Sequence, residues 1–390
     1  KADISMAIRE GASGTGTSGK TSRLRGLLIA FELALAVVLT VGAGLLLRTF
    51  WGLLQENPGF NPSRVVAADI WLPFPNNPDL DRYAKPESLN TFVKESLRRI
   101  SAIPGVEMAS MTSDLPVTHS SRRVLLAIED RPVESQKGLI TEISRVTPEY
   151  FKVLQASLLR GRLFAEDDQF GKLPVVIVDE STARTFWPDR DVLGRRLSFG
   201  RAGASPTWWT VVGVIKDIKN DGLDQAATPH IYLPMYQVPG LKSLNVAVRT
   251  SLSVTSLEPQ IRREVQAVDS NLPVSNVRSM NEVIDKSLAS RRLSAELVGV
   301  FAVLALLLAS VGIYGLLAYT VSQRSHEIGV RMALGAKPSA IGTMILSRAA
   351  LLAGGGAVAG LIFSALIARP MIATQLYGVH PVDPMVFLAV

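Results

Sequence analysis

The chain has 390 residues and no cysteine, and 41 Lys and Arg residues against 34 Asp and Glu residues give a formal charge of +7 at pH 7. The lack of cysteine excludes disulfides, cysteine-ligated zinc, iron–sulfur clusters and thiol catalysis. Four scattered histidines argue against a His-rich metal site. Taken alone, the positive charge would indicate nucleic acid or a membrane surface as the partner.

Long apolar blocks explain a mean hydropathy of +0.25, which is high for a soluble protein. Residues 26–47 contain one charge, Glu32, while 297–321 and 349–368 contain none. Each block is long enough to cross about 30 Å of hydrocarbon as a helix. We therefore expect three membrane spans. Residues 384–390 read as the start of a fourth span, and the missing initiator Met indicates a fragment.

The basic residues in the short flanks of these spans predict the orientation. Segments 1–25 and 322–348 each carry a net charge of +3. Because short positive segments stay in the cytoplasm, we expect both there, and the long segment 48–293 outside. The net positive charge of the chain is then explained by its membrane topology. The sequence contains no basic stripe with interleaved aromatic residues, which is the pattern that would indicate binding to nucleic acid.

The segment between the first two spans has a mixed α/β pattern. Its first part predicts a helix over 79–100 and strands at 64–72, 105–112 and 122–128. Its last part predicts a helix over 254–268 and strands at 244–249 and 274–277. Between them we expect a helix over 181–187 and strands at 175–178, 193–199 and 208–214. The economical arrangement is a split α/β part, 62–147 and 243–278, with an inserted subdomain, 148–240. A helical stalk over 280–292 leads into the second span.

Two stretches imitate nucleotide-binding motifs. Residues 14–21 match G-x-x-x-x-G-K-[ST], but a phosphate loop needs a preceding strand and a soluble helix. Only four residues separate this stretch from the first span, so we interpret it as a linker. Residues 175–180, VVIVDE, lie on the other side of the membrane and read as a strand that ends at a helix N-terminus. The sequence thus predicts no catalytic, metal-binding or cofactor-binding residue.

The spans contain one acidic residue and several glycines. Glu32 is either a proton relay or ion site, or a protonated glutamate used in helix packing. Glycines at 354–356 and 360, and at 312 and 315, would let helices approach closely. We therefore expect these glycines at helix contacts.

The loop 322–336 predicts a short amphipathic helix. Glu327 and Arg331 stand at i and i+4 in the favourable order, and Ile328, Met332 and Gly335 share a face. Gly335 is suited to end the helix, since Pro338 cannot continue it. Such a helix could lie on anionic lipid or dock on a cytoplasmic partner.

This loop also carries a family resemblance. Residues 324–336, RSHEIGVRMALGA, are similar to the R-x-x-E-I-G-[IV]-R-x-A-L-G-A stretch of MacB/FtsX-type ABC transporter permeases. Residues 309–315 resemble the second span of that family. The family's extracytoplasmic core is matched by three stretches of this chain, residues 180–188, 193–197 and 211–214. The likeness covers essentially the whole chain. It is nearest to one half of the duplicated acidobacterial permeases, in which a region like 1–25 links two halves.

The resemblance implies an α-helical transmembrane bundle with a large α/β extracytoplasmic domain, 48–293. That domain would contain a ferredoxin-like part with an inserted second subdomain. Residues 294–390 would be an FtsX-like transmembrane domain containing spans 297–321 and 349–368 and the truncated span 384–390. The coupling helix, 322–336, would contact the ATPase through Arg324, Glu327, Ile328, Arg331, Met332, Leu334 and Gly335.

The resemblance also implies a function and partners. The chain would be a non-enzymatic permease of the bacterial inner membrane, binding no cofactor itself, with ATP on a separate cytoplasmic ABC ATPase. It would transmit ATP-driven motion to the outer domain for export or extrusion of a substrate. Other partners would be the bilayer, a second permease half or copy, and a periplasmic protein. The alternatives are a sensor or scaffold that regulates a partner such as a cell-wall hydrolase, and a membrane-anchored NTPase using residues 14–21.

Overall fold

The structure is a computed structural model that describes residues 15–73, 81–118, 122–129, 131, 139–188, 190–200, 207–238, 240–241 and 243–367. The chain divides into two compact units. The helical unit comprises 1–55 and 290–390, and the α/β unit comprises 56–289. We describe each unit by itself.

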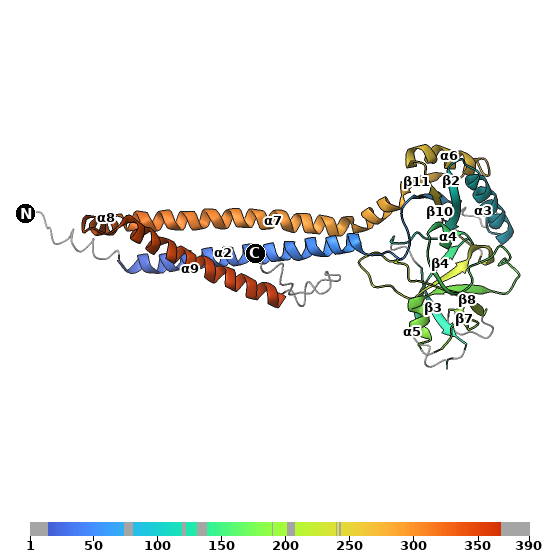
Figure 1. The fold of residues 1–390 in the computed structure, drawn as a ribbon, viewed down its shortest axis with the longest axis horizontal. Helices are drawn as coiled ribbons and strands as arrows, with labels where there is room; N and C mark the ends of the chain where they lie inside the picture. The colour runs from blue at the N-terminus through green and yellow to red at the C-terminus, as the bar shows by residue number, and fades with distance from the viewer. Residues whose placement is uncertain are drawn as a thin grey trace, which may run out of the picture. The chain divides into compact units, whose positions relative to one another are not determined.

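Four helices build the described part of the helical unit (Figure 1): α2 (Thr15–Gln55), α7 (Met280–Gln323) from residue 290 on, α8 (Ser325–Ala333) and α9 (Pro338–Ile367). Three helical segments are long and apolar enough to cross a membrane: Gly26–Gln55, Ala289–Gln323 and Pro338–Leu366. Each of the three expected spans therefore falls within a described helix that is long and apolar enough to cross a membrane. The expected start of a fourth span, 384–390, lies outside the described residues.

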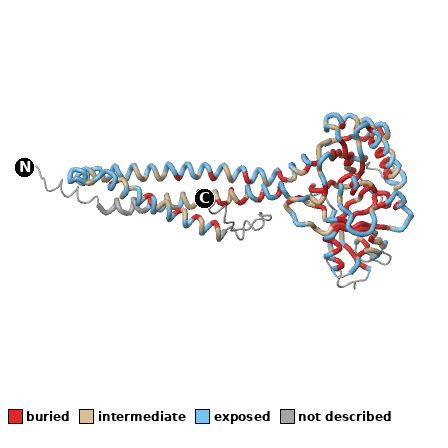
Figure 2. The backbone as a smooth tube through the Cα atoms, viewed as in Figure 1, coloured by how far each residue is buried: buried red, intermediate tan, exposed pale blue. Residues whose placement is uncertain are grey.

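Long stretches of the helical unit are exposed, as the pale blue segments of its helices in Figure 2 show, and many of these exposed residues are large and apolar. Leu308, Val311 and Leu351 are more than 60% exposed. In water such a surface would be strongly unfavourable, whereas hydrocarbon accepts it at no cost. The α7 helix begins at Met280, where the helical stalk was expected, and runs without a break to Gln323.

Gly356 and Gly360 bring α2 and α9 together as predicted, whereas the prediction is wrong for Gly315, where a β-carbon would meet no atom within 4 Å. A β-carbon on Gly360 would lie 2.7 Å from the carbonyl oxygen of Ala34, so only glycine permits this approach. A small cluster of Val37, Val41 and Leu45 packs beside the contact. Gly354 and Gly355 face open space, so the close approach is confined to Gly356 and Gly360.

The described strands form one eleven-stranded sheet, and its first part is the antiparallel order β11-β1-β10-β2, which is joined to the rest where Thr112 of β2 pairs with Val146 of β4. Its elements are β1 (Val65–Trp71), α3 (Pro86–Ser101), β2 (Val106–Thr112), β10 (Ser243–Thr250), α6 (Val254–Gln266) and β11 (Val274–Ser279). The two helices pack against each other and share one hydrophobic core with the strands. In α3 the buried residues Leu89, Phe92, Val93 and Leu97 form a single apolar stripe at helical spacing.

The second part is a ring of six strands, β4-β3-β7-β8-β6-β9, closed by a parallel pairing of β9 with β4. They are β3 (Arg122–Ile128), β4 (Ile140–Val146), β6 (Val175–Asp179), β7 (Arg196–Phe199), β8 (Trp209–Ile215) and β9 (His230–Pro234). The edge strand β5 (Leu158–Gly161) pairs with β8. The described residues of this unit also form the short elements α4 (Tyr150–Val153), α5 (Glu180–Phe186) and the 3₁₀ turn η3 (Met235–Gln237).

Among the described residues the ring has its own core of fourteen buried apolar side chains, which include Ile143, Val178, Leu197 and Ile231. The strands that form the ring differ from those that the sequence predicts for the inserted subdomain. The strand 122–128 was grouped with the split part, and β4, β5 and β9 were not anticipated. In the structure β3 pairs with β7 and β4 pairs with β9, so 122–146 joins the ring.

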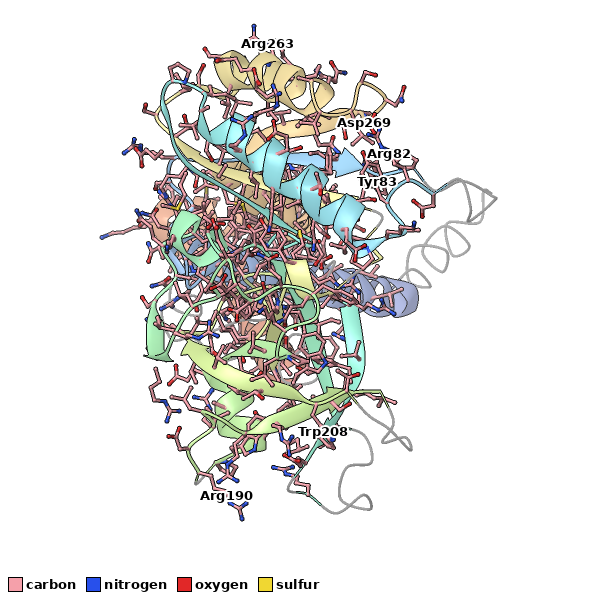
Figure 3. The ribbon with its side chains drawn as sticks, turned by 90° about the vertical axis from the view of Figure 1, so that its right-hand side faces the viewer. Arg82, Tyr83, Arg190, Trp208, Arg263 and Asp269 are labelled. Carbon is pink, nitrogen blue, oxygen red and sulfur yellow. The ribbon has the colours of Figure 1, made fainter. Side chains whose placement is uncertain are left out.

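The helix expected over 79–100 begins at Pro86, whose ring suits the first helical turn. The preceding segment is held by an ionic contact with the loop after α6. The Tyr83 hydroxyl donates to Oδ2 of Asp269 (2.6 Å), and Arg82 contacts the same oxygen (3.0 Å). Figure 3 shows these three labelled residues together near α6, away from Trp208 and Arg190.

Candidate functional site

The candidate site is α8, which spans Ser325–Ala333 and has no buried residue. Its acidic and basic residues pair as the spacing predicted: Nη2 of Arg331 lies 2.8 Å from Oε1 of Glu327. Both side chains are about half exposed, so solvent screens the pair and it adds only about 0.3–0.5 kcal/mol to helix stability. Its main effect is to set the position of both charges on the helix surface.

The C-terminus of α8 is closed by a defined cap. Gly335 has a φ of +90°, its N–H donates to the carbonyl of Met332, and the N–H of Ala336 donates to that of Arg331. This pair of bonds is a Schellman motif, in which glycine adopts the left-handed conformation without strain. The predicted role of Gly335 is therefore confirmed. Pro338 then starts α9 instead of continuing α8.

Around this cap the apolar side chains face outward. Leu334 is 83% exposed, and Met332 and Val330 are each nearly half exposed. Ile328 and Arg324 are partly covered. Burying a leucine on a partner contributes about 1.5–3 kcal/mol. The helix thus presents an apolar tip next to the Glu327–Arg331 pair, which is an arrangement suited to docking.

One contact at the site was not anticipated. Nη1 of Arg331 lies 3.4 Å from the thioether sulfur of Met344 on α9. Arg331 therefore connects the charge pair of α8 to the following span. No short motif signals this contact, because Met344 lies beyond the helix break at Pro338 and meets Arg331 only through the turn between the helices.

The two stretches that match nucleotide-binding motifs, residues 14–21 and 175–180, have other structural roles. Residues 15–21 belong to α2, so this stretch is helical. Residues 175–180 form β6 and the start of α5, where Oδ1 of Asp179 accepts the N–H of Thr182 at 2.7 Å as an N-cap. This confirms the predicted strand ending at a helix N-terminus. Among the described residues, no group of three or more metal-ligating side chains could hold an ion.

The α/β unit also contains a buried Ser–His–Glu arrangement. Nε2 of His230 lies 3.0 Å from Oγ of Ser144, and Nδ1 lies 3.8 Å from Oε2 of Glu142. All three residues are at most 3% exposed, so no substrate reaches the hydroxyl. We interpret the group as structural, since it joins the neighbouring strands β4 and β9.

Burial sets the electrostatics of this region. It lowers the pKa of His230 despite the nearby Glu142, so the imidazole is neutral. Burial also disfavours the charge of Glu142, but the neighbouring His230, Asp221 and Arg123 outweigh it and lower the pKa of Glu142 to about 2. Burial raises the pKa of Asp179 to about 7, against the hydrogen bonds it accepts from Thr182 and His230.

Comparison with known proteins points to one family. The family model described as "MacB-like periplasmic core domain" matches residues 33–264, and "FtsX-like permease C-terminal" matches residues 299–390. The α8 site lies in the second match.

Curated relatives include the probable syringafactin export ATP-binding/permease protein SyfD of Pseudomonas syringae pv. tomato. It is 28% identical over 230 residues, which cover 56% of this chain and 33% of SyfD. The macrolide export ATP-binding/permease protein MacB of Escherichia coli K12 is 26% identical over 233 residues, covering 57% of this chain and 35% of MacB. The chain thus spans about a third of the length of these relatives.

Two solved structures share similarity with this chain. The periplasmic region of MacB from Actinobacillus actinomycetemcomitans has 15% identity and a TM-score of 0.37, covering 58% of this chain and 94% of that one. The extracellular domain of the noncanonic ABC-type transporter YknZ from Gram-positive bacteria has 13% identity and a TM-score of 0.37. It covers 54% of this chain and 100% of the other.

Proposed function

The chain belongs to the MacB/FtsX-type ABC transporter permeases, and from that premise we propose that it transmits ATP-driven motion from the cytoplasm to an extracytoplasmic domain. ATP would be bound and hydrolysed on a separate ABC ATPase that grips α8. The observation that carries this proposal is the exposed apolar tip of α8, Met332 and Leu334, capped by Gly335 beside the Glu327–Arg331 pair.

The same proposal includes a membrane topology and a set of partners. The N-terminus and α8 would lie in the cytoplasm and the α/β unit outside, in agreement with the basic flanks 1–25 and 322–348. An ABC ATPase works as a dimer, so a second permease half or copy would dock on its other side. The motion would drive export or extrusion of a substrate.

We also propose a ferredoxin-like arrangement for the first part of the α/β unit. The β1-α3-β2 and β10-α6-β11 segments, with antiparallel order β11-β1-β10-β2, support it. The six-stranded ring would be the inserted subdomain, displaced as a unit when the spans move.

The test is reconstitution of the chain with its ATPase in lipid vesicles. Leu334→Asp should leave membrane insertion intact and weaken ATPase docking roughly 10-fold or more, since an apolar anchor is replaced by a charge. His326→Ala, an exposed change on the same helix, is the matched control. Unchanged docking in Leu334→Asp would contradict the proposal.

A second measurement separates export from the sensor or scaffold alternative. Candidate substrates should stimulate ATP hydrolysis by the reconstituted complex if the chain serves export. Stimulation only by a co-purified extracytoplasmic protein would instead favour the regulatory function.

A further inference from the structure

The chain passes from the first span into the α/β unit through residues 56–64, a segment that we call the strap. It begins where α2 ends and leads directly into β1. Two side-chain turns shape it: the N–H of Gly59 donates to Oδ1 of Asn57 (2.9 Å), and the N–H of Ser63 donates to Oδ1 of Asn61 (3.0 Å). The strap therefore has a defined local structure.

The middle of the strap is fastened at residues 217–219, just after β8 of the six-stranded ring. The N–H of Lys219 donates to the carbonyl oxygen of Pro58 at 3.0 Å. Gly59 has a φ of +83°, and a β-carbon on it would lie 1.9 Å from the carbonyl oxygen of Asp217. Glycine is therefore the residue that lets the strap lie this close to the ring.

Residues 217–219 are in turn held by the ring. The Asp217 carboxylate accepts two hydrogen bonds from Ser181 at the start of α5, one from the N–H (2.7 Å) and one from the hydroxyl (2.6 Å). Beside them, Nδ2 of Asn220 donates to the hydroxyl of Tyr232 on β9 at 2.8 Å. The α5 helix packs on β6, β8 and β9. A continuous set of contacts thus joins the strap to the strands of the ring.

The far end of the strap belongs to the four-stranded part, β11-β1-β10-β2. Arg249 of β10 donates from Nη1 to the carbonyl of Ser63 (2.9 Å) and from Nη2 to that of Asn61 (3.0 Å). The N–H of Thr250 donates to the carbonyl of Arg64 at 2.8 Å. The strap therefore crosses from the ring to the four-stranded part, and the contact with the ring comes first on the path from α2.

The helix that carries the second span starts from the four-stranded part directly. Its first residue, Met280, follows β11 without a connecting segment. Oγ of Ser279 accepts the N–H of Glu282 at 3.1 Å, and Met280 and Val283 are buried. In the sheet Ser279 pairs with Val66 of β1, the strand that follows the strap. Both spans would therefore act on the same two strands if the strap were not fastened to the ring.

Fastening shortens the free chain that follows the first span. The nine residues of the strap could extend to about 30 Å, whereas the two residues before Pro58 reach about 7 Å. Glu56, the first of them, already lies 3.7 Å from Nζ of Lys219. A displacement of α2 by more than a few ångströms would therefore move residues 217–219 and, with them, the ring.

We propose that the strap makes the first span move the ring, while the second span moves the four-stranded part. A shift of α2 relative to α7 then changes the position of the ring relative to the four-stranded part. Gly59 is the positioning residue of this device. The inference rests on the proposed function for the origin of the shift, which is ATP-driven motion, whereas the attachment of the strap needs no ATPase.

Hydrogen exchange of the full chain in lipid vesicles, without an ATPase, tests the attachment. Gly59→Ala should lift the strap from Asp217 and raise the exchange rate of amides 181–183 in α5 roughly fivefold or more, with less than about a twofold change in α3 and α6. Gly171→Ala is the matched control, since Gly171 has the same φ of +83° but a β-carbon there would meet no atom within 4 Å. Unchanged exchange in α5, or an equal change in α3 and α6, would overturn the proposal.

Spin labels test the motion in the complex with the ATPase. The chain has no native cysteine, so Arg190→Cys on the ring and Arg263→Cys on α6 accept labels at exposed positions, at opposite ends of the α/β unit in Figure 3. We expect ATP binding to change the distance between the labels by about 3 Å or more. Inserting Gly-Ser-Gly-Ser after Gln55 adds about 14 Å of free chain and should abolish this change without removing a strap contact. The same insertion after Gly171 should leave it intact.

The outcomes separate the strap from the proposed function. A distance change that persists with the insertion after Gln55 would overturn the strap and leave ATP-driven coupling standing. A constant distance in the chain without an insertion, while the ATPase still docks, would mean that the α/β unit moves as one body and would also overturn the proposal. Failure of the ATPase to dock would contradict the proposed function, and the hydrogen-exchange comparison would then decide the attachment of the strap by itself.

Discussion

A β-carbon placed on Gly356 of α9 would lie 2.6 Å from the carbonyl oxygen of Ala30 on α2, well inside van der Waals contact. The helices can touch there only because Gly356 has no side chain. In a bilayer, where lipid is as apolar as leucine, such close packing is a main source of helix association. This relationship makes Gly356 a sensitive position in the helical unit.

Gly356→Val should destabilise the α2–α9 contact by about 1–3 kcal/mol, since the added side chain forces two backbones apart. The measurement is thermal unfolding of the purified chain in detergent. Gly354→Val is the matched control, because a β-carbon at Gly354 meets no atom within 4 Å. Equal loss of stability in both variants would show that the contact is absent.

Alanine substitutions at two glycines near the C-terminus of α8 should have opposite effects on the stability of this helix. Gly335→Ala places a side chain at a φ of +90° and should cost about 1 kcal/mol or more of α8 stability. Gly329→Ala, in the helix interior and facing open space, should stabilise α8 by about 0.5–1 kcal/mol. Amide hydrogen exchange of residues 325–336 measures both effects. If the tip of α8 docks an ATPase, Gly335→Ala also lowers the transport obtained per ATP hydrolysed.

Substitution of Arg249 on β10 should strongly reduce the stability of the α/β unit. Its buried guanidinium donates to the carbonyl oxygens of Val153 (2.7 Å), Ser63 (2.9 Å) and Asn61 (3.0 Å). Arg249→Leu leaves these three carbonyls without their donor and should lower the free energy of unfolding by about 2–4 kcal/mol. Arg263→Leu, with its side chain 72% exposed, should change it by less than about 0.5 kcal/mol. Chemical denaturation of the full chain compares the two variants.

Much of the architecture could be predicted because its signals are local. Span 297–321 is a continuous apolar run, and the cap at Gly335 needs only a glycine followed by Pro338. The six-stranded ring could not be predicted in the same way. Its closure depends on β9, five residues with one histidine and a terminal proline, pairing with β4 some 90 residues earlier. Neither strand carries a strong period-2 pattern.

The candidate site shows the same division. The Glu327–Arg331 pair follows from i,i+4 spacing and was predicted. The contact of Arg331 with Met344, and that of Glu32 with Gly312, join residues of different helices. No spacing rule within one helix encodes which turn of a second helix lies opposite. The sequence marked Glu32 as unusual, but the structure was needed to show that it contacts Gly312 of α7.

The pH dependence of stability gives the last prediction, through Asp179. Its pKa is raised by burial to about 7, against about 4 in an unfolded chain. Between these values the folded chain holds a proton that the unfolded chain has lost. The stabilisation is therefore complete below about pH 4 and is lost as the pH rises through 7.

Asp179→Asn keeps an acceptor for the N–H of Thr182 but cannot titrate. The difference in free energy of unfolding between wild type and Asp179→Asn should therefore change by up to about 1.4 kcal/mol per pH unit between pH 5 and 7, in the direction of lower relative wild-type stability at higher pH. His230 contributes an opposite slope, because its lowered pKa makes folding more favourable as the pH rises toward 6.5. That slope is common to both proteins and cancels in the difference. Hydrogen exchange of β6 and β9 amides in the full chain measures the free energy of unfolding of each protein. A difference between the two proteins that stays constant with pH would show that Asp179 is ionised in the folded chain throughout this range.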